Sequence, residues 1–280
     1  MKPLLAEIDR IINLSLAEDI GKGDITSNLT IPKEKTASFT ISPREDIIIC
    51  GLDIATRVFH IISPDIKIDC SFKDGNTVKK SEIILSGKGN ALAIMAAERV
   101  ALNLLRQLSG VATNTARFVA KTKGTRAKIL DTRKTIPGLR SIQKYAVTTG
   151  GGKNHRFCLD DGILIKDNHI AICGSITNAI IKVRNNAPSL TKIEVECDSL
   201  NQVKEALEAG ADIIMLDNMD LNTIKEAVKI VGGRILLEAS GNVNIYTVED
   251  IAHTGVDFIS VGSITHSPLS VDIGLDIDIS

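Results

Sequence analysis

Five cationic side chains between residues 133 and 166 are of types that bind anions. The stretch GGGKNHR, residues 150–156, sets three glycines before a run of donors. It is not a phosphate loop of the G-x-x-x-x-G-K-[ST] type, because Asn154 follows the lysine. Taken alone, it fits either a solvated turn or a pocket for an anion. With neighbouring cations it forms a group suited to carboxylates or phosphates, whose members are Arg133, Lys134, His155, Arg156 and Lys166.

A second group is acidic. Glu196 and Asp217 each follow a short apolar run, and such carboxylates suit a hard divalent ion or a developing positive charge. The turns ASGN, residues 239–242, and SVGS, residues 260–263, offer backbone N–H groups of the kind that hold phosphate. These residues predict a substrate with carboxylates, a phosphorylated second substrate and magnesium.

Repeated β-α units must position these side chains. Short apolar runs alternate with helical segments, and Ser199 and Gly210 read as the cap and the stop of one such helix. The spacing predicts parallel strands covered by helices, in about six units where a complete TIM barrel has eight. A doubly wound open sheet remains an alternative. The predicted strands are 127–132, 162–167, 192–197, 212–217, 234–239 and 257–262.

Polar residues stand at the end of each predicted strand. In parallel α/β folds the chemistry collects at the carboxyl edge of the sheet. A single charge at a strand end is more often a solvated cap or a salt-bridge partner, but six polar edges in succession favour a site. The polar positions are 131–134, 166–169, Glu194, Glu196, Asp198, Asp217, Asn218, Glu238, Ser240, Gly241, Gly262, Ser263 and His266.

The first half of the chain predicts a mixed α+β arrangement without regular alternation. Helical spacing covers residues 4–19 and 51–62, and short β-like runs surround the second helix. A long apolar helix from Ala91 is expected to stop at Gly110. We therefore expect an N-terminal mixed α/β domain, 1–112, and a βα barrel as the catalytic domain, 113–266. We expect the tail, 267–280, to pack back on the first domain.

The amino-acid composition argues against several classes of function for this protein. The 280 residues carry a net charge of −1, only 3% are aromatic and there is no Trp, which does not favour nucleic acid as a partner. Acidic residues interrupt the N-terminus, and no apolar run has the length of a membrane span. The five cysteines contain no C-x-x-C pair, which favours a reducing compartment. We expect a soluble cytoplasmic protein without a membrane partner.

The same residues carry a family resemblance. The chain resembles nicotinate-nucleotide pyrophosphorylase, that is, quinolinate phosphoribosyltransferase (decarboxylating), through most of its length. The motifs that carry the resemblance are AEDIGKGDITS, ERVALNLLRQLSGVAT, ILDTRKTIPGLRSIQKYAVTTGGGKNHR, LIKDNHI, ADIIMLDNM, LEASGNVN and TGVDFISVGSITHS. The resemblance implies a mixed N-terminal domain, a barrel of six βα units and a role in NAD biosynthesis. It also implies that quinolinate and phosphoribosyl pyrophosphate become nicotinate mononucleotide, pyrophosphate and CO2, with Mg²⁺ as cofactor.

The resemblance also implies roles for individual residues. Quinolinate carboxylates would be bound by Arg133, His155, Arg156 and Lys166, with Arg99 contributed by the other subunit of a homodimer; assembly into a hexamer stays open. Phosphoribosyl pyrophosphate would be bound by Lys134, Glu196, Asp217, Ser240, Gly241, Gly262 and His266. Glu196 and Asp217 would act near the ribose and the magnesium ion, directly or through water. Glu196, Asp217, Lys134 and Lys166 are the expected catalytic residues, and His169 is expected to hold a strand end in place.

Some positions depart from the family pattern. Asn242 stands where a second glycine is usual, although Asn tolerates a left-handed backbone better than most residues. Ile136 and Cys158 also differ from the pattern.

Two other functions compete with this one. One alternative is a transferase of the molybdenum-transport-associated ModD type, with another acceptor. The other is a non-catalytic sensor of a phosphorylated metabolite, against which the acidic pair argues, since a binder gains nothing from stabilising a transition-state cation.

Overall fold

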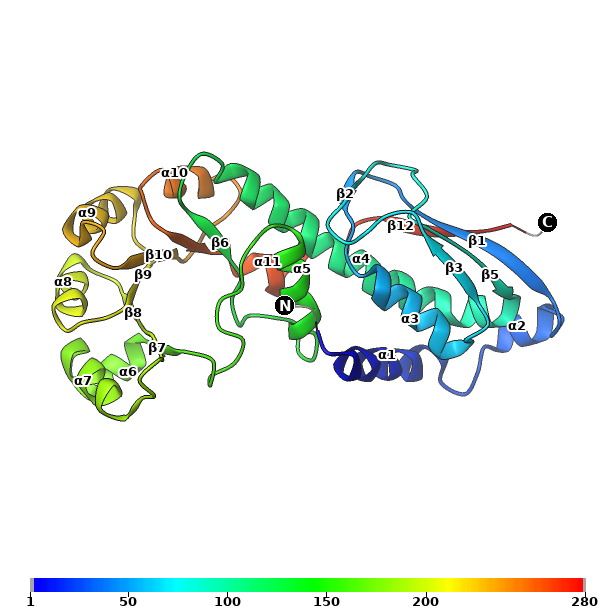
Figure 1. Ribbon diagram of the computed structural model, residues 1–280, viewed down its shortest axis with the longest axis horizontal. Coiled ribbons are helices and arrows are strands. Elements are labelled where there is room, and N and C mark those ends of the chain that lie inside the picture. The colour runs from blue at the N-terminus through cyan, green and yellow to red at the C-terminus, as the bar shows by residue number, and fades with distance from the viewer. Residues whose placement is uncertain (1–2, 279–280) are drawn as a thin grey trace. The chain divides into compact units, whose positions relative to one another are not determined.

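The computed structural model describes residues 3–278 and forms two compact units (Figure 1). The first unit contains the chain up to Ala116, the segment Thr135–Gly151 and the chain from Thr265 onward. The second unit contains Arg117–Lys134 and Gly152–Ile264. This division places residues 135–151 with the first unit, and the domain boundaries expected at 112/113 and 266/267 stay a proposal.

A parallel six-stranded sheet forms the centre of the second unit. The strand order is β6-β11-β10-β9-β8-β7. The two strands that come first in this unit, β6 and β7, are therefore its two edge strands. Every hydrogen-bonded pair in it is parallel. This is the predicted barrel of six βα units. The strands are β6 (Lys128–Leu130), β7 (Ile163–Ile165), β8 (Ile193–Cys197), β9 (Ile213–Asp217), β10 (Leu236–Ser240) and β11 (Phe258–Ser260).

Helices follow the strands of this sheet and lie along its outer side (Figure 1). Ser199 accepts a hydrogen bond from the backbone N–H of Gln202 and so caps α8 as predicted. The same helix ends just before Gly210, whose φ is 85°. The helices are α6 (Asp167–Cys173), α7 (Ile176–Asn186), α8 (Leu200–Glu208), α9 (Leu221–Val231) and α10 (Val248–Ala252), with the short α11 (Ser263–His266) after β11.

An antiparallel four-stranded sheet forms the first unit, in the order β12-β1-β5-β3. The C-terminal strand β12 pairs with β1 from Ser38 to Pro43, and Phe39 stacks on Phe59 with ring centroids 4.9 Å apart. The strands are β1 (Thr36–Pro43), β3 (Lys67–Cys70), β5 (Leu85–Asn90) and β12 (Ile273–Asp278), and a separate pair is formed by β2 (Ile47–Ile48) and β4 (Thr77–Val78). The helices are α1 (Leu5–Ile20), α2 (Ile25–Thr30), α3 (Leu52–Ile62), α4 (Ala91–Lys121) and α5 (Arg140–Thr149).

The prediction that the long helix stops at Gly110 is wrong. Helix α4 continues through this position to Lys121. The glycine serves close packing instead, because a Cβ added at Gly110 would lie 1.9 Å from the carbonyl oxygen of Leu269. Within the described residues, no helix is both long enough and apolar enough to cross a membrane.

Candidate active site

The strands of the second unit turn their charged side chains to one face of the sheet. Alternate residues of a strand share a face, and residues paired across neighbouring strands point the same way. Glu196 and Glu238 both pair with Met215, from opposite sides of β9, and Asp217 pairs with Ser240. These side chains therefore share a face toward the carboxyl edge. The opposite face is apolar, and its residues that are at most 1% exposed include Val195, Ile214, Leu216, Leu237 and Ile259.

Lys166 and Glu196 form an ion pair across the ends of β7 and β8. The distance between Lys166 Nζ and Glu196 Oε2 is 2.5 Å, and the lysine side chain keeps 44% of its surface exposed. His169 Nδ1 accepts a hydrogen bond from the backbone N–H of Lys166 at 2.9 Å. The histidine thus holds the junction of β7 and α6, the supporting role that the sequence suggests.

The glycine stretch leads the chain from α5 to the side of β6. At Gly150, an added Cβ would lie 2.3 Å from the carbonyl oxygen of Ala112, and Gly151 has a φ of 90°, which favours glycine. Lys153 then donates its backbone N–H to the carbonyl oxygen of Ile129 at 2.8 Å. The stretch is therefore neither a phosphate loop nor a loosely solvated turn, since its last residues join the edge of the sheet.

His155 follows directly and is held at three points. Its backbone N–H donates to Asp131 Oδ1 at 2.9 Å. Its Nε2 lies 2.9 Å from Glu194 Oε2, and its Nδ1 accepts the backbone N–H of Arg156 at 2.8 Å. The histidine predicted to bind quinolinate is thus bonded to the protein through both ring nitrogens.

Arg156 and Arg133 place two guanidinium groups near each other. Arg156 Nη1 donates to the carbonyl oxygen of Gly162 at 2.8 Å. Burial lowers the pKa of Arg156, and the positive charge of Arg133 lowers it further. Two cations that repel each other at a partly buried site are well suited to an anion that neutralises both.

Glu194 and Glu238 lie beneath His155 and are almost completely buried, at 6% and 1% exposure. Burial raises the pKa of Glu238 to about 8, and the negative charge of Glu194 adds to this while His155 opposes it. The sequence marks both glutamates as strand-end residues but assigns them no role. Glu194 stands two residues before Glu196, and this spacing is the signal that places it on the same face.

The turn after β10 uses left-handed backbone conformations. Gly241 and Asn242 have φ values of 92° and 52°. A Cβ on Gly241 would lie 2.2 Å from Asn218 Oδ1, which also accepts a hydrogen bond from Asn242 Nδ2 at 3.0 Å. Asn218 in turn donates to Asp217 Oδ2 at 2.8 Å. Asn242 therefore fills the usual glycine position in a glycine-like conformation and ties the turn to the acidic end of β9.

The remaining predicted residues are divided between the units. Lys134 is exposed, and its backbone N–H donates to Thr132 Oγ1 at 3.0 Å. Gly262 follows β11. Arg99 and His266 belong to the first unit, where Arg99 is an exposed residue of α4. The predicted residues that the second unit brings to its own carboxyl edge are Arg133, Lys134, His155, Arg156, Lys166, Glu196, Asp217, Ser240, Gly241 and Gly262.

Two sets of side chains offer ligand atoms of types that bind metal ions. Glu196 and Asp217 provide carboxylates at neighbouring strand ends, the donor type that Mg²⁺ prefers. Within residues 3–278, one group of His and acidic residues has its ligand atoms within 4.8 Å of one another, namely His155, Glu194 and Glu238.

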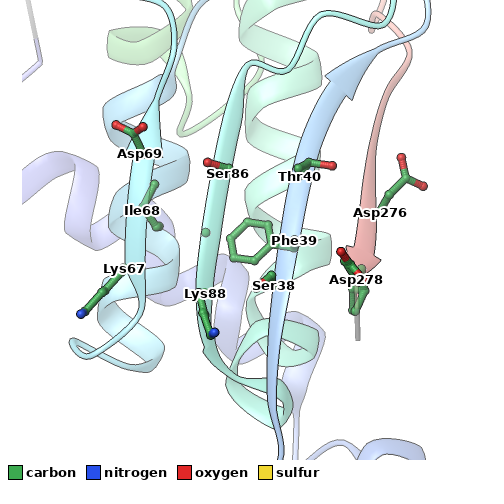
Figure 2. Close-up of a pocket in the computed structure, with 12 residues that line it drawn as sticks. Ser38, Phe39, Thr40, Lys67, Ile68, Asp69, Ser86, Lys88, Asp276 and Asp278 are labelled. Atoms are coloured by element: carbon green, nitrogen blue, oxygen red, sulfur yellow. The ribbon is translucent and has the colours of Figure 1, made fainter. Parts of the chain in front are cut away.

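A pocket of about 490 Å³ lies on the antiparallel sheet of the first unit (Figure 2). Lys67 and Lys88 line it together with acidic side chains, including Asp69 and Asp276. Figure 2 shows these basic and acidic groups interspersed along the neighbouring strands. None of the predicted site residues lines this pocket, so its volume does not mark the chemistry.

The second unit defines a class of protein: a βα-barrel enzyme whose sheet edge carries cations and carboxylates for anionic small molecules. The sequence matches the family model "Quinolinate phosphoribosyl transferase, C-terminal domain" over residues 111–276 and the corresponding N-terminal domain model over residues 24–109. The chain belongs to the quinolinate phosphoribosyltransferase family.

Individual relatives agree with this membership. The chain is 42% identical over 274 residues to a probable nicotinate-nucleotide pyrophosphorylase (carboxylating) of Bacillus subtilis, covering 98% of this chain and 94% of the relative. A probable enzyme of the same name from Methanocaldococcus jannaschii is 44% identical, with 96% of each chain covered. The crystal structure of nicotinate-nucleotide pyrophosphorylase from Ehrlichia chaffeensis superposes with a TM-score of 0.94 at 46% identity, covering 99% of this chain and 100% of that one.

Proposed function

We propose that this chain catalyses its family's reaction at the carboxyl edge of the six-stranded sheet. Phosphoribosyl passes from phosphoribosyl pyrophosphate to the ring nitrogen of quinolinate, and one carboxyl group is lost. The products are nicotinate mononucleotide, pyrophosphate and CO2, which makes this a decarboxylating step of NAD biosynthesis. The supporting observation is the pair of guanidinium groups at Arg133 and Arg156, at an edge that also carries the Lys166–Glu196 ion pair.

Quinolinate is a dianion, and its two adjacent carboxylates need several charged donors if water is to be excluded. Arg133, Arg156 and Lys166 supply three cations from this unit. Arg99 of the partner subunit would supply a fourth in a homodimer, in keeping with the exposure of the Arg99 side chain on α4. Assembly into a hexamer is an extension of the same proposal.

Glu196 and Asp217 act on the ribose. Transfer of a ribosyl group passes through an oxocarbenium-like state, which nearby carboxylates stabilise more than they stabilise the ground state. Lys166 orients Glu196 through their 2.5 Å contact, and its ammonium group also serves the quinolinate carboxylate. Asn218 fixes Asp217 from the side of the turn.

The same two carboxylates fit a magnesium ion. They are hard oxygen donors at neighbouring strand ends, and Mg²⁺ is usually held by one or two carboxylates together with substrate phosphates. When bound, the ion neutralises charge on the pyrophosphate leaving group. Lys134 is exposed and adds a further positive charge for the pyrophosphate.

The 5′-phosphate binds at the glycine-containing turns. The left-handed backbone at Gly241 and Asn242 presents N–H groups without side-chain obstruction at Gly241. Ser240 and Gly262 stand at the ends of β10 and β11. The family resemblance assigns His266 to the same role.

Decarboxylation needs no separate cofactor. Once ribosylated, the ring nitrogen is cationic, and its charge stabilises the electron pair that the departing CO2 leaves on the adjacent carbon. That carbon then takes a proton, giving nicotinate mononucleotide. Arg133 and Arg156, which we call the arginine clamp, hold the ring in place while this carboxylate is released.

A cytoplasmic location is part of the proposal. All five cysteines are free, as expected in a reducing compartment.

The direct test is a product assay. Purified protein is incubated with Mg²⁺, phosphoribosyl pyrophosphate and quinolinate, and nicotinate mononucleotide is measured by chromatography. A parallel reaction offers nicotinate in place of quinolinate. We expect product only with quinolinate, because the clamp requires both carboxylates. Product from nicotinate at an equal rate would point to another acceptor, and ligand binding without any turnover would point to a sensor.

A further inference from the structure

We propose that His155 acts as a positioning residue for Arg156, and that the buried pair Glu194 and Glu238 holds its ring, so that neither ring nitrogen binds the substrate. The identity of that substrate rests on the proposed function, and the family resemblance by itself would assign His155 to the quinolinate site. Glu194 and Glu238 do not bind the substrate themselves. They hold the His155 ring and thereby help to orient the Arg156 side chain.

The hydrogen bonds of the imidazole assign its proton. Nδ1 accepts the backbone N–H of Arg156 at 2.8 Å, so Nδ1 carries a lone pair. A neutral imidazole has one donor and one acceptor nitrogen, and the proton therefore lies on Nε2. Nε2 is 2.9 Å from Glu194 Oε2 and 3.7 Å from Glu238 Oε2. Both nitrogens are thus used inside the protein.

Burial fixes this arrangement. The side chains of His155, Glu194 and Glu238 are only 14%, 8% and 2% exposed. Because the His155 backbone is also tied to Asp131, the ring and the main chain are both anchored. The neighbouring Arg156 then leaves a fixed backbone, and its Nη1 is directed by the carbonyl oxygen of Gly162.

A metal ion is the competing occupant of this cluster, since the ligand atoms of the three residues lie within 4.8 Å of one another. A metal would need the lone pair of Nε2. The proton would then have to move to Nδ1, and the bond from the Arg156 N–H would be lost. The raised pKa of Glu238 also supports a neutral carboxyl group beside Glu194.

Nitrogen NMR of the wild-type protein, labelled at histidine, gives a readout independent of variant folding. We expect His155 to show a protonated Nε2 and an unprotonated Nδ1, both in the free protein and after addition of quinolinate. A ring that becomes doubly protonated, or whose Nδ1 signal moves to the protonated range on quinolinate binding, would show direct contact with the carboxylate and overturn the proposal.

Kinetics of variants provide the second arm. His155→Ala and Glu238→Ala should each raise the KM for quinolinate by about tenfold or more with a smaller change in kcat, because a displaced clamp loses charged contacts. The double variant should be no worse than the worse single variant, since both act through one ring. Glu238→Gln should restore near-normal KM, because its amide can donate to Glu194 as a neutral carboxyl group does. If the increases in KM multiplied in the double variant, or if Glu238→Gln did not restore the KM, the positioning role would be contradicted.

Titration of the wild-type protein with Zn²⁺ alone tests the competing occupant. Tight binding that Glu238→Gln abolishes would overturn the proposal in favour of a metal site, and we expect none. The arms also separate the two levels of inference. A wild-type protein without turnover would refute the proposed function while leaving the tautomer result standing, and an active protein with a doubly protonated His155 would refute only the positioning role.

Discussion

At the scale of single residues, like charges are held close together on both sides of the site. Burial lowers the pKa of Arg156 and raises the pKa of Glu238, and the like charges of Arg133 and Glu194 add to these two shifts. Such pairs are costly in an empty protein and become favourable when a ligand or a proton compensates them. The two pairs differ in this respect, because the arginines are proposed to bind an anionic substrate, whereas the glutamates lie against the ring of His155.

The first prediction separates binding from turnover. Arg156→Ala should raise the KM for quinolinate by roughly tenfold to a hundredfold, since a charged hydrogen bond contributes about 1.5–3 kcal/mol. Glu196→Gln should mainly lower kcat, because its charge acts on the transition state. Steady-state kinetics check both, with Lys229→Ala, an exposed residue of α9, as the control. Equal and mild effects of the two site variants would argue against the division of roles.

The second prediction concerns pH and stability. Glu238 has a pKa of about 8 in the folded protein, above the ordinary value of a glutamate. The unfolded chain therefore loses this proton at lower pH than the folded protein, and folding stability falls as pH rises between these two pKa values.

Glu238→Gln removes that titration. Each unit of pKa difference corresponds to about 1.4 kcal/mol, so between pH 5 and pH 8 the wild type should lose on the order of 2–4 kcal/mol relative to the variant. Denaturant unfolding of both proteins across this range measures the difference. A constant difference between them would show that Glu238 is ionised in the folded protein at pH 5.

At the scale of elements, the alternation of apolar runs and helical segments predicted the parallel sheet and its polar edge. Period two also explains why Glu196, Asp217 and Ser240 share a face. The end of α4 was not predictable, because Gly110 meets the carbonyl oxygen of Leu269, a residue far away in sequence. For the same reason the sequence marks Glu238 as polar but does not reveal that it lies 3.7 Å from His155 Nε2, because the two residues are far apart in sequence.

The third prediction tests the reason why α4 passes through Gly110. Replacing a helical glycine by alanine normally stabilises a protein by up to about 1 kcal/mol. At Gly110 the added Cβ would lie 1.9 Å from a backbone oxygen, and overpacking of this kind costs about 1–3 kcal/mol. Gly110→Ala should therefore lower the free energy of unfolding, measured by denaturant. Gly162→Ala is the control, since its nearest neighbour atom is 3.8 Å away; a more stable Gly110→Ala protein would contradict this packing.

At the scale of the whole molecule, the residues assigned to the proposed site are distributed over both units. The arginine clamp, Glu196 and Asp217 belong to the second unit, whereas Arg99 and His266 belong to the first. The C-terminal strand β12 also returns to β1 in the first unit. The proposed homodimer adds a further level, since Arg99 would act in the partner's site.

The fourth prediction tests this sharing. Arg99→Ala and Arg156→Ala should each be nearly inactive alone at low quinolinate concentration. After denaturation and refolding of an equimolar mixture, half of the dimers should combine one subunit of each kind, and each such dimer should contain one intact site. Activity should recover to about a quarter of the wild-type value by this symmetry argument. If Arg99 served its own subunit's site, no intact site would form and no activity would return.

The central claim is that quinolinate binds at the carboxyl edge of the six-stranded sheet. A crystal structure with quinolinate bound tests it most directly. We predict that its two carboxylates lie within hydrogen-bond distance of Arg133, Arg156 and Lys166. Quinolinate bound elsewhere, for instance in the pocket on the antiparallel sheet, with these three side chains unengaged, would contradict the account.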